Sequence, residues 1–71
     1  MQKLIRAYGK SELASLYYPH CTSSWARRLM AQDLERYPGL MDRLRQQGWN
    51  PTSRLLRPHW VRTIFDAIGE P

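Results

Sequence analysis

The segment Pro58–Gly69, with the sequence PHWVRTIFDAIG, carries the clearest structural signal in this chain. Four of its apolar residues recur at positions i, i+3, i+4 and i+7, namely Val61, Ile64, Phe65 and Ile68. This spacing places them on one face of an α-helix. Proline suits the first helical turn and glycine the position after the last, so a helix is predicted within this segment. Its apolar face needs other elements to cover it, which predicts a mainly α-helical domain.

A short helix is predicted at Ser11–Tyr18, in the N-terminal part of the chain. Ser11 suits the N-cap position, because its hydroxyl can accept a hydrogen bond from a free backbone N–H. Pro19 ends this helix, since the residue before a proline avoids the helical region. The apolar side chains that share one face are Leu13, Leu16 and Tyr17.

A longer helix is predicted at Ser23–Tyr37, with Thr22 or Ser23 as its N-cap. The residues expected on its inward face are Trp25, Ala26, Leu29, Met30, Leu34 and Tyr37. Asp33 falls within this apolar face. Two explanations stay open: either Asp33 borders the core near Arg36, or the helix bends there.

A third helix is predicted at Pro38–Gln47, with the proline in its first turn and Gly48 as the C-terminal cap. After it, residues 53–56 are expected to form a short strand whose natural partner is residues 4–8. Strands of this length are marginal alone and need helices behind them. The predicted fold class is therefore mainly α, with four short helices in a helix-turn-helix-like arrangement and a minimal two-stranded pairing.

Length and composition favour one small domain over residues 1–71. The chain has 71 residues, of which 42% are hydrophobic, and this content argues against disorder. Cys21 is the single cysteine, so no disulfide can form within the chain, which is typical of a reducing compartment. Neither a secretory signal nor a membrane span is recognised, and a cytoplasmic protein is expected.

The sequence offers little support for an enzyme or for a metal or cofactor site. The candidate metal ligands are His20, Cys21 and His59, and they lack the paired spacing of zinc sites. No nucleophile motif flanks Cys21, which is expected to fill space in a turn. The tripeptide Gly9-Lys10-Ser11 matches the end of a phosphate-binding loop, but the first glycine of that motif is absent. We therefore expect no catalytic residues and no cofactor.

Eleven Lys and Arg against six Asp and Glu give the chain a net charge of +5, and nine of the eleven are Arg. The charge is spread along the chain, so it indicates either an ordinary solubilising surface or contact with a polyanion. The tryptophans Trp25, Trp49 and Trp60 could likewise serve as stacking platforms for bases. In so small a domain, core packing is the more ordinary role for tryptophan.

The order of a short helix, a polar turn and a longer helix resembles the opening of many DNA-binding helix-turn-helix domains. The resemblance rests on the segment KSELASLY and on the turn residues before Trp25. It implies that the second helix faces base edges in the major groove and that nearby basic residues hold phosphates. The DNA-contacting residues that it implies are Ser23, Ser24, Arg27, Arg28, Gln32, Lys10, Arg54 and Arg57. The basic connector RLLR before Pro58, if paired with residues 4–8, is similar to the wing of excisionase and MerR-type proteins.

Nearly the whole chain also resembles a domain-of-unknown-function family of short proteins from Bacteroides-type bacteria. The segments that carry this resemblance are YGKSELASLYYP, LRQQGW and RLLRPHWVRTIFDAIGEP. In the closing pattern, Pro58, Val61, Ile64 and Gly69 match, whereas Arg57 stands where a Ser or Thr cap is expected. The resemblance supports the fold and implies no activity.

Two functions remain open on the sequence alone. The first is a DNA-binding helix-turn-helix module with double-stranded DNA as its partner. The alternative is a small helical protein–protein interaction domain that forms a homodimer or binds a protein partner. Its mark would be an exposed apolar patch that includes Trp60, Trp49 or Met41.

Overall fold

A computed structural model describes residues 5–50 and 52–71 of the chain. Four helices and two very short strands follow one another along the sequence. In chain order they are β1 (Tyr8–Gly9), α1 (Lys10–Tyr17), α2 (Ser23–Arg36), α3 (Leu40–Gln46), β2 (Leu55–Leu56) and α4 (Pro58–Ile68). The predicted fold class, four short helices with a two-stranded pairing, is confirmed. None of the described helices has the length and apolar character needed to cross a lipid bilayer.

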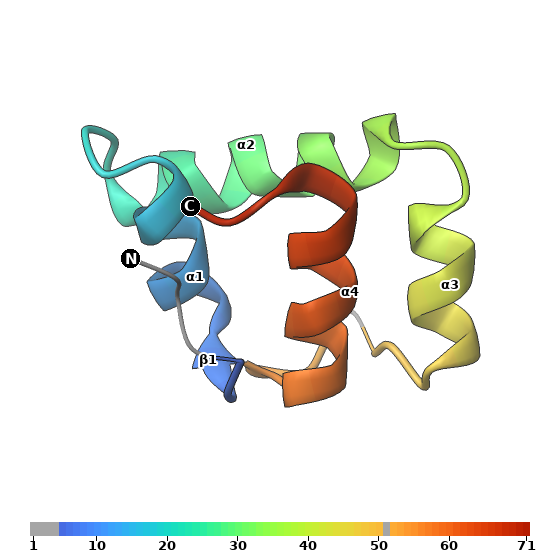
Figure 1. Ribbon diagram of the computed structural model, residues 1–71. Coiled ribbons are helices and arrows are strands. Elements are labelled where there is room, and N and C mark those ends of the chain that lie inside the picture. Colours follow the sequence, from blue (N-terminus) through green and yellow to red (C-terminus); the bar gives the residue numbers. More distant parts are fainter. Residues whose placement is uncertain (1–4, 51) are drawn as a thin grey trace.

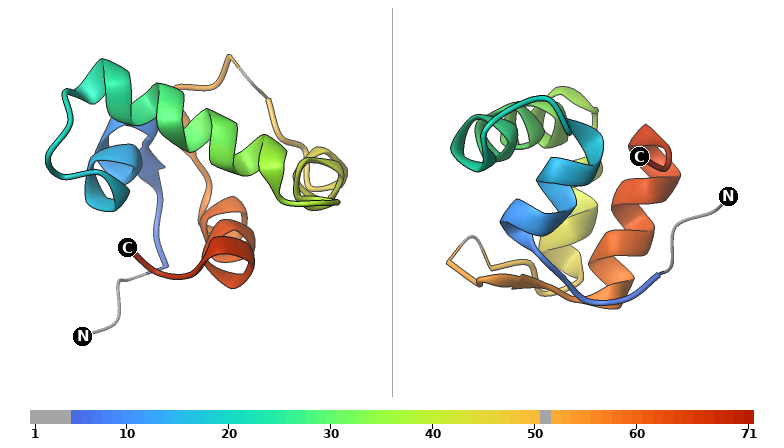
Figure 2. Two further views of the ribbon diagram at one scale, coloured as in Figure 1. Left: turned by 90° about the horizontal axis from the view of Figure 1, so that it is seen from above. Right: turned by 90° about the vertical axis from the view of Figure 1, so that its left-hand side faces the viewer.

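Helix α2 lies across one end of the other three helices, and the strand pair lies at the opposite end (Figure 1). Helix α4 stands between α1 and α3 in Figure 1, and the two further views show that it lies to one side of α2 (Figure 2). Helix α1 packs mainly on α2, and α3 packs on α4.

The core is built around the apolar face of α4. Val61 and Ile64 are fully buried, and Phe65 is 6% exposed. The ring of Phe65 meets the ring of Tyr17 edge-on, at a centroid distance of 6.4 Å, which joins α4 to α1. The fully buried Ala14 and Ala26 have small side chains that let α1 and α2 approach closely.

Two strands of two residues each join the segment before α1 to the segment before α4. Tyr8 pairs with Leu56 and Gly9 pairs with Leu55, in antiparallel register. The expected pairing of residues 4–8 with 53–56 is thus present, but it is shorter and extends one residue further, to Gly9. Residue 4 lies outside the described part of the chain.

The first and third helices begin at other residues than predicted. Helix α1 has Gly9, not Ser11, as its N-cap, and the Glu12 carboxylate accepts a hydrogen bond from the Gly9 N–H at 3.1 Å. Helix α3 starts at Leu40 after Gly39, whose φ of 78° is left-handed, so Pro38 precedes the helix. The predicted Thr22 cap of α2 is confirmed, since its hydroxyl accepts from the Trp25 N–H.

The inward face of α2 is narrower than predicted. Trp25 and Tyr37 are 48% and 40% exposed, so neither belongs to the core. Asp33 borders the core, and its carboxylate accepts a hydrogen bond from the hydroxyl of Tyr18. The explanation that Asp33 borders the core near Arg36 is therefore right in part. Asp33 does border the core, but its hydrogen-bond partner is Tyr18, in the turn after α1.

The end of α3 is joined to α4 through Gln47. Its backbone carbonyl accepts hydrogen bonds from the Trp60 indole N–H at 2.9 Å and lies 3.1 Å from His59 Nε2. The Gln47 side-chain oxygen accepts from the hydroxyl of Thr63 at 2.9 Å. Trp60 is only 2% exposed, so it is a core residue and not a stacking platform or part of an exposed patch.

The turn after α3 is a Schellman motif that needs a glycine. The Gly48 N–H donates to the Arg45 carbonyl, the Trp49 N–H donates to the Leu44 carbonyl, and the φ of Gly48 is 86°. This left-handed conformation reverses the chain direction and brings the Trp49 ring to 5.1 Å from the Trp60 ring. The predicted cap at Gly48 is confirmed.

Gly48→Ala should lower the free energy of unfolding by about 1 kcal/mol, because an L side chain is strained at this φ. Thermal unfolding followed by circular dichroism measures the change. The matched control is Gly9→Ser, since Gly9 has a φ of −67° and a Cβ there would lie 3.8 Å from Glu12 Cβ, an ordinary contact. We expect this control to keep native stability or exceed it slightly; equal losses in both variants would contradict the role given to Gly48.

Candidate functional site

The start of α1 and the residue before β2 are held side by side by the backbone. The Lys10 N–H donates a hydrogen bond to the Arg54 carbonyl at 3.3 Å, next to the Gly9–Leu55 strand pair. Two basic residues that are 44 positions apart in the sequence are thereby fixed as neighbours. Their proximity follows from strand pairing and does not depend on side-chain conformation.

A hollow of about 510 Å³ opens beside this junction. We call it the basic hollow, and its lining residues are Gly9, Lys10, Ser11, Glu12, Arg27, Thr52, Ser53 and Arg54. Three of these residues are cationic, and they come from α1, from α2 and from the segment before β2. The convergence of three separate segments makes this a concentration of positive charge that sequence position alone does not show.

The one acid in the basic hollow is already engaged. Glu12 Oε2 lies 2.8 Å from a guanidinium nitrogen of Arg6, and Glu12 Oε1 accepts from the Gly9 N–H. The hydrogen bond from Arg6, with that from the Gly9 backbone, lowers the pKa of the Glu12 carboxyl. This carboxylate is therefore compensated by Arg6, and the hollow keeps an excess of positive charge from Lys10, Arg27 and Arg54.

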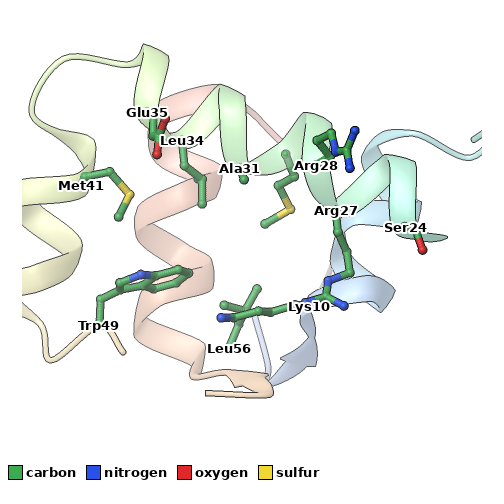
Figure 3. A pocket seen from close by; sticks show the side chains of 11 residues that line it. Lys10, Ser24, Arg27, Arg28, Ala31, Leu34, Glu35, Met41, Trp49 and Leu56 are labelled. Atoms are coloured by element: carbon green, nitrogen blue, oxygen red, sulfur yellow. The ribbon is translucent and has the colours of Figure 1, made fainter. Parts of the chain in front are cut away.

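A second hollow of about 520 Å³ adjoins the first on the other side of Lys10 (Figure 3). We call it the apolar groove, and the apolar residues that line it are Met30, Ala31, Leu34, Met41, Trp49 and Leu56. Its polar lining residues are Lys10, Ser24, Arg27, Arg28 and Glu35. Lys10 and Arg27 line both hollows, so they form the partition between them.

Lys10 extends from the start of α1 toward Trp49, with Arg27 beside it (Figure 3). Its ammonium nitrogen lies 5.3 Å from the centroid of the Trp49 ring, within the range of a cation–π contact. Burial and, second, the charge of Arg27 lower the pKa of the Lys10 ammonium. The partition between the hollows is thus a partly desolvated cation with a second cation next to it.

The arginines of this region are not held in ion pairs. Within residues 5–50 and 52–71 the ion pairs are Arg6–Glu12 and Arg45–Asp42. The guanidinium groups of Arg27 and Arg54 are therefore open to an external anion. The Arg28 guanidinium carbon lies 5.3 Å from the centroid of the Trp25 ring, which supports it on the surface of α2.

Five of the eight residues predicted to contact DNA line the two hollows, namely Lys10, Ser24, Arg27, Arg28 and Arg54. Three do not line either hollow. Ser23 is exposed in the first turn of α2. Gln32 is exposed on α2, one helical turn after Arg28. Arg57 is the N-cap of α4, and its guanidinium carbon lies 5.8 Å from the centroid of the Trp60 ring.

Sequence reasoning did not find the wall of the groove opposite α2. Trp49 and Met41 form this wall, although the sequence presents them only as possible members of an exposed patch. The hydroxyl-bearing Thr52 and Ser53 in the basic hollow were missed as well. The Gly48-Trp49 pair after a predicted helix was the available signal, because a glycine-terminated helix folds the next residue back toward it.

The described residues contain no group of three or more His, Cys, Asp or Glu side chains placed to hold a metal ion. Cys21 is partly exposed in the turn between α1 and α2 and packs against the core. The chemistry that the site offers is thus that of cations, hydroxyls and apolar side chains.

Comparison with known proteins identifies one family. A family model described as "Domain of unknown function (DUF4248)" matches residues 4–71. No curated protein and no solved structure matches the chain. The resemblance to a domain-of-unknown-function family is confirmed at this level.

Arg27→Gln should raise the pKa of the Lys10 ammonium toward its ordinary value, because one of the two causes that lower it is removed. Burial remains, so we expect the pKa to stay below that of an exposed lysine. An NMR titration of the Lys10 side-chain carbon and proton shifts measures it. Arg62→Gln, at an exposed position of α4, is the control and should leave the Lys10 pKa unchanged. A Lys10 pKa that is the same in the native chain and in Arg27→Gln would disprove the proximity of the two charges.

Proposed function

Because the chain belongs to the DUF4248 family, whose description assigns no function, we propose a function from the surface of this member: it binds double-stranded DNA. The proposed interface combines the helix pair α1 and α2 with the basic hollow beside them. In this proposal α1, the turn between the helices and α2 act as a helix-turn-helix. The short strand pair acts as a small wing that carries Arg54.

The observation that carries this proposal is the convergence of Lys10, Arg27 and Arg54 around one hollow whose single acid is paired with Arg6. A cluster of basic groups attracts a polyanion, and release of its counterions drives association. The hollow also lies at the N-terminus of α1, where the helix dipole and backbone N–H groups favour a phosphate. The charge of the basic side chains and the positive end of the helix dipole therefore attract an anion to the same place.

The exposed side of α2 supplies the groups for reading bases. Arg28 and Gln32 are one helical turn apart and so share a row on the outer surface of the helix. Arginine can donate two hydrogen bonds to guanine, and glutamine can exchange two with adenine, in the major groove. In the proposed complex this row faces base edges, whereas Arg27 lies toward the phosphates. Ser23 and Ser24 in the first turn of α2 contact the adjoining backbone.

Protein–protein interaction finds less support than DNA binding. The apolar patch that would mark it was expected to include Trp60, Trp49 or Met41, and of these Trp60 is buried in the core. Trp49 and Met41 line the apolar groove, whose rim is basic. The surface around α2 is therefore better suited to an anionic partner than to a flat apolar interface.

The proposal is tested by fluorescence anisotropy with a labelled mixed-sequence duplex of about 20 base pairs, at salt concentrations from about 50 mM upward. We expect binding at low salt, with log Kd changing steeply with log salt concentration. The double variant Arg27→Gln/Arg54→Gln should weaken binding by about 10-fold or more and reduce the salt slope by roughly 2 × 0.9.

The matched control is Arg43→Gln/Arg62→Gln, which removes the same charge from exposed positions on α3 and α4. This control should retain close to native affinity. The absence of binding at low salt would end the proposal. Equal losses in the two double variants would show that net charge, and not this surface, is responsible.

A further inference from the structure

The apolar groove is not explained by DNA binding. A phosphate backbone needs the cations around the basic hollow, but it does not need a neighbouring depression with an apolar floor. Leu34 and Met30, each 5% exposed, and the fully buried Leu56 form this floor. Trp49 and Met41 lie on one side of this floor, and Lys10 extends from beside Arg27 toward Trp49, with its ammonium nitrogen 5.3 Å from the centroid of that ring (Figure 3). The groove thus places cations directly beside an apolar floor and wall.

We propose that the apolar groove is a binding site for a small amphipathic carboxylate, with its anionic group at Lys10 and Arg27 and its apolar body against Trp49 and Met41. The ligand class is a medium-chain fatty acid or an aromatic carboxylic acid of similar size. This site shares Lys10 and Arg27 with the surface proposed to bind DNA, but its apolar residues Trp49 and Met41 have no part in that proposal.

The size of the groove matches a small molecule. Its volume of about 520 Å³ falls within the range of about 300–1,000 Å³ that is typical of ligand sites. Helix α2 borders the groove along one side (Figure 3).

The charges at the groove select an anion. Lys10, Arg27 and Arg28 line it against the single carboxylate of Glu35. Burial and the nearby charge of Arg27 lower the pKa of the Lys10 ammonium, so an anion at this position would be favoured by both cations. A ligand carboxylate at this position would stabilise both cations through charge-assisted hydrogen bonds. A neutral molecule with the same apolar body cannot form these charge-assisted hydrogen bonds.

The apolar side of the groove is adaptable. Met41 is unbranched and polarisable, so it can adjust to ligands of different outline. The Trp49 ring packs on Trp60, at a centroid distance of 5.1 Å, which holds it in place as a firm wall. Ala31, exposed on α2, leaves the space above the floor open because its side chain is small.

Binding is tested with octanoate and 1-octanol, which share an alkyl chain and differ in the anionic group. Two-dimensional NMR of the nitrogen-15 labelled chain follows the three tryptophan indole N–H signals. We expect saturable binding of octanoate that shifts the Trp49 signal while Trp25, outside the groove, changes little. Octanol should bind about 5-fold or more weakly, since it makes no charge-assisted hydrogen bond.

Two variants locate the ligand. Ala31→Phe fills the groove from an exposed helical position and should abolish octanoate binding while the thermal unfolding temperature stays close to native. Gln32→Phe adds the same ring to the neighbouring exposed position outside the groove, and it should bind octanoate as the native chain does. Lys10→Gln should weaken octanoate by about 5-fold or more and leave octanol unchanged.

Three results would overturn the inference. One is native-like octanoate binding in Ala31→Phe, which would place the ligand elsewhere. Another is equal affinity for octanoate and octanol together with no effect of Lys10→Gln. The third is a dimer in sedimentation experiments whose interface covers Trp49, because a second copy of the chain would then occupy the groove. Each of these outcomes is independent of whether the chain binds DNA.

Discussion

The pairing of residues 8–9 with residues 55–56 is the constraint on which the arrangement of this domain depends. Four residues make it, and it joins the segment before α1 to the segment before α4. The Lys10–Arg54 backbone hydrogen bond continues the pairing by one step. Because α1 and α4 both begin at this point, their starts are fixed relative to each other. Lys10 and Arg54, two of the three cations of the basic hollow, are neighbours for the same reason.

The fold follows from the sequence where a local pattern and the tertiary environment agree. The apolar spacing in α4 is long and regular, and the structure buries Val61, Ile64 and Phe65 fully or nearly so and Ile68 in part. The predicted start of α3 at Pro38 was wrong. Proline suits a first helical turn, but Gly39 adopts a left-handed conformation, and the helix begins only at Leu40. The partner of Asp33 also could not be predicted from the local pattern. The packing of α1 on α2 brings the hydroxyl of Tyr18 to the Asp33 carboxylate, and helical spacing in the sequence does not show this contact.

The candidate site divides in the same way between local and long-range information. Arg27 and Arg28 could be placed on the exposed side of a helix from their spacing alone. Their relation to Lys10 and Trp49 could not, because it depends on a strand pair and a glycine turn far away in the sequence. Net charge indicated a polyanion as one possible partner. It did not indicate an apolar groove, which exists only where side chains from several elements meet.

Gln47 joins the end of α3 to α4, because its carbonyl and its side-chain oxygen both accept hydrogen bonds from that helix. Helices α1 and α2 pack on each other. The apolar groove has Trp49, which follows α3, on one side and Ala31 of α2 on the other. An occupant would therefore contact both helix pairs at once and bridge them.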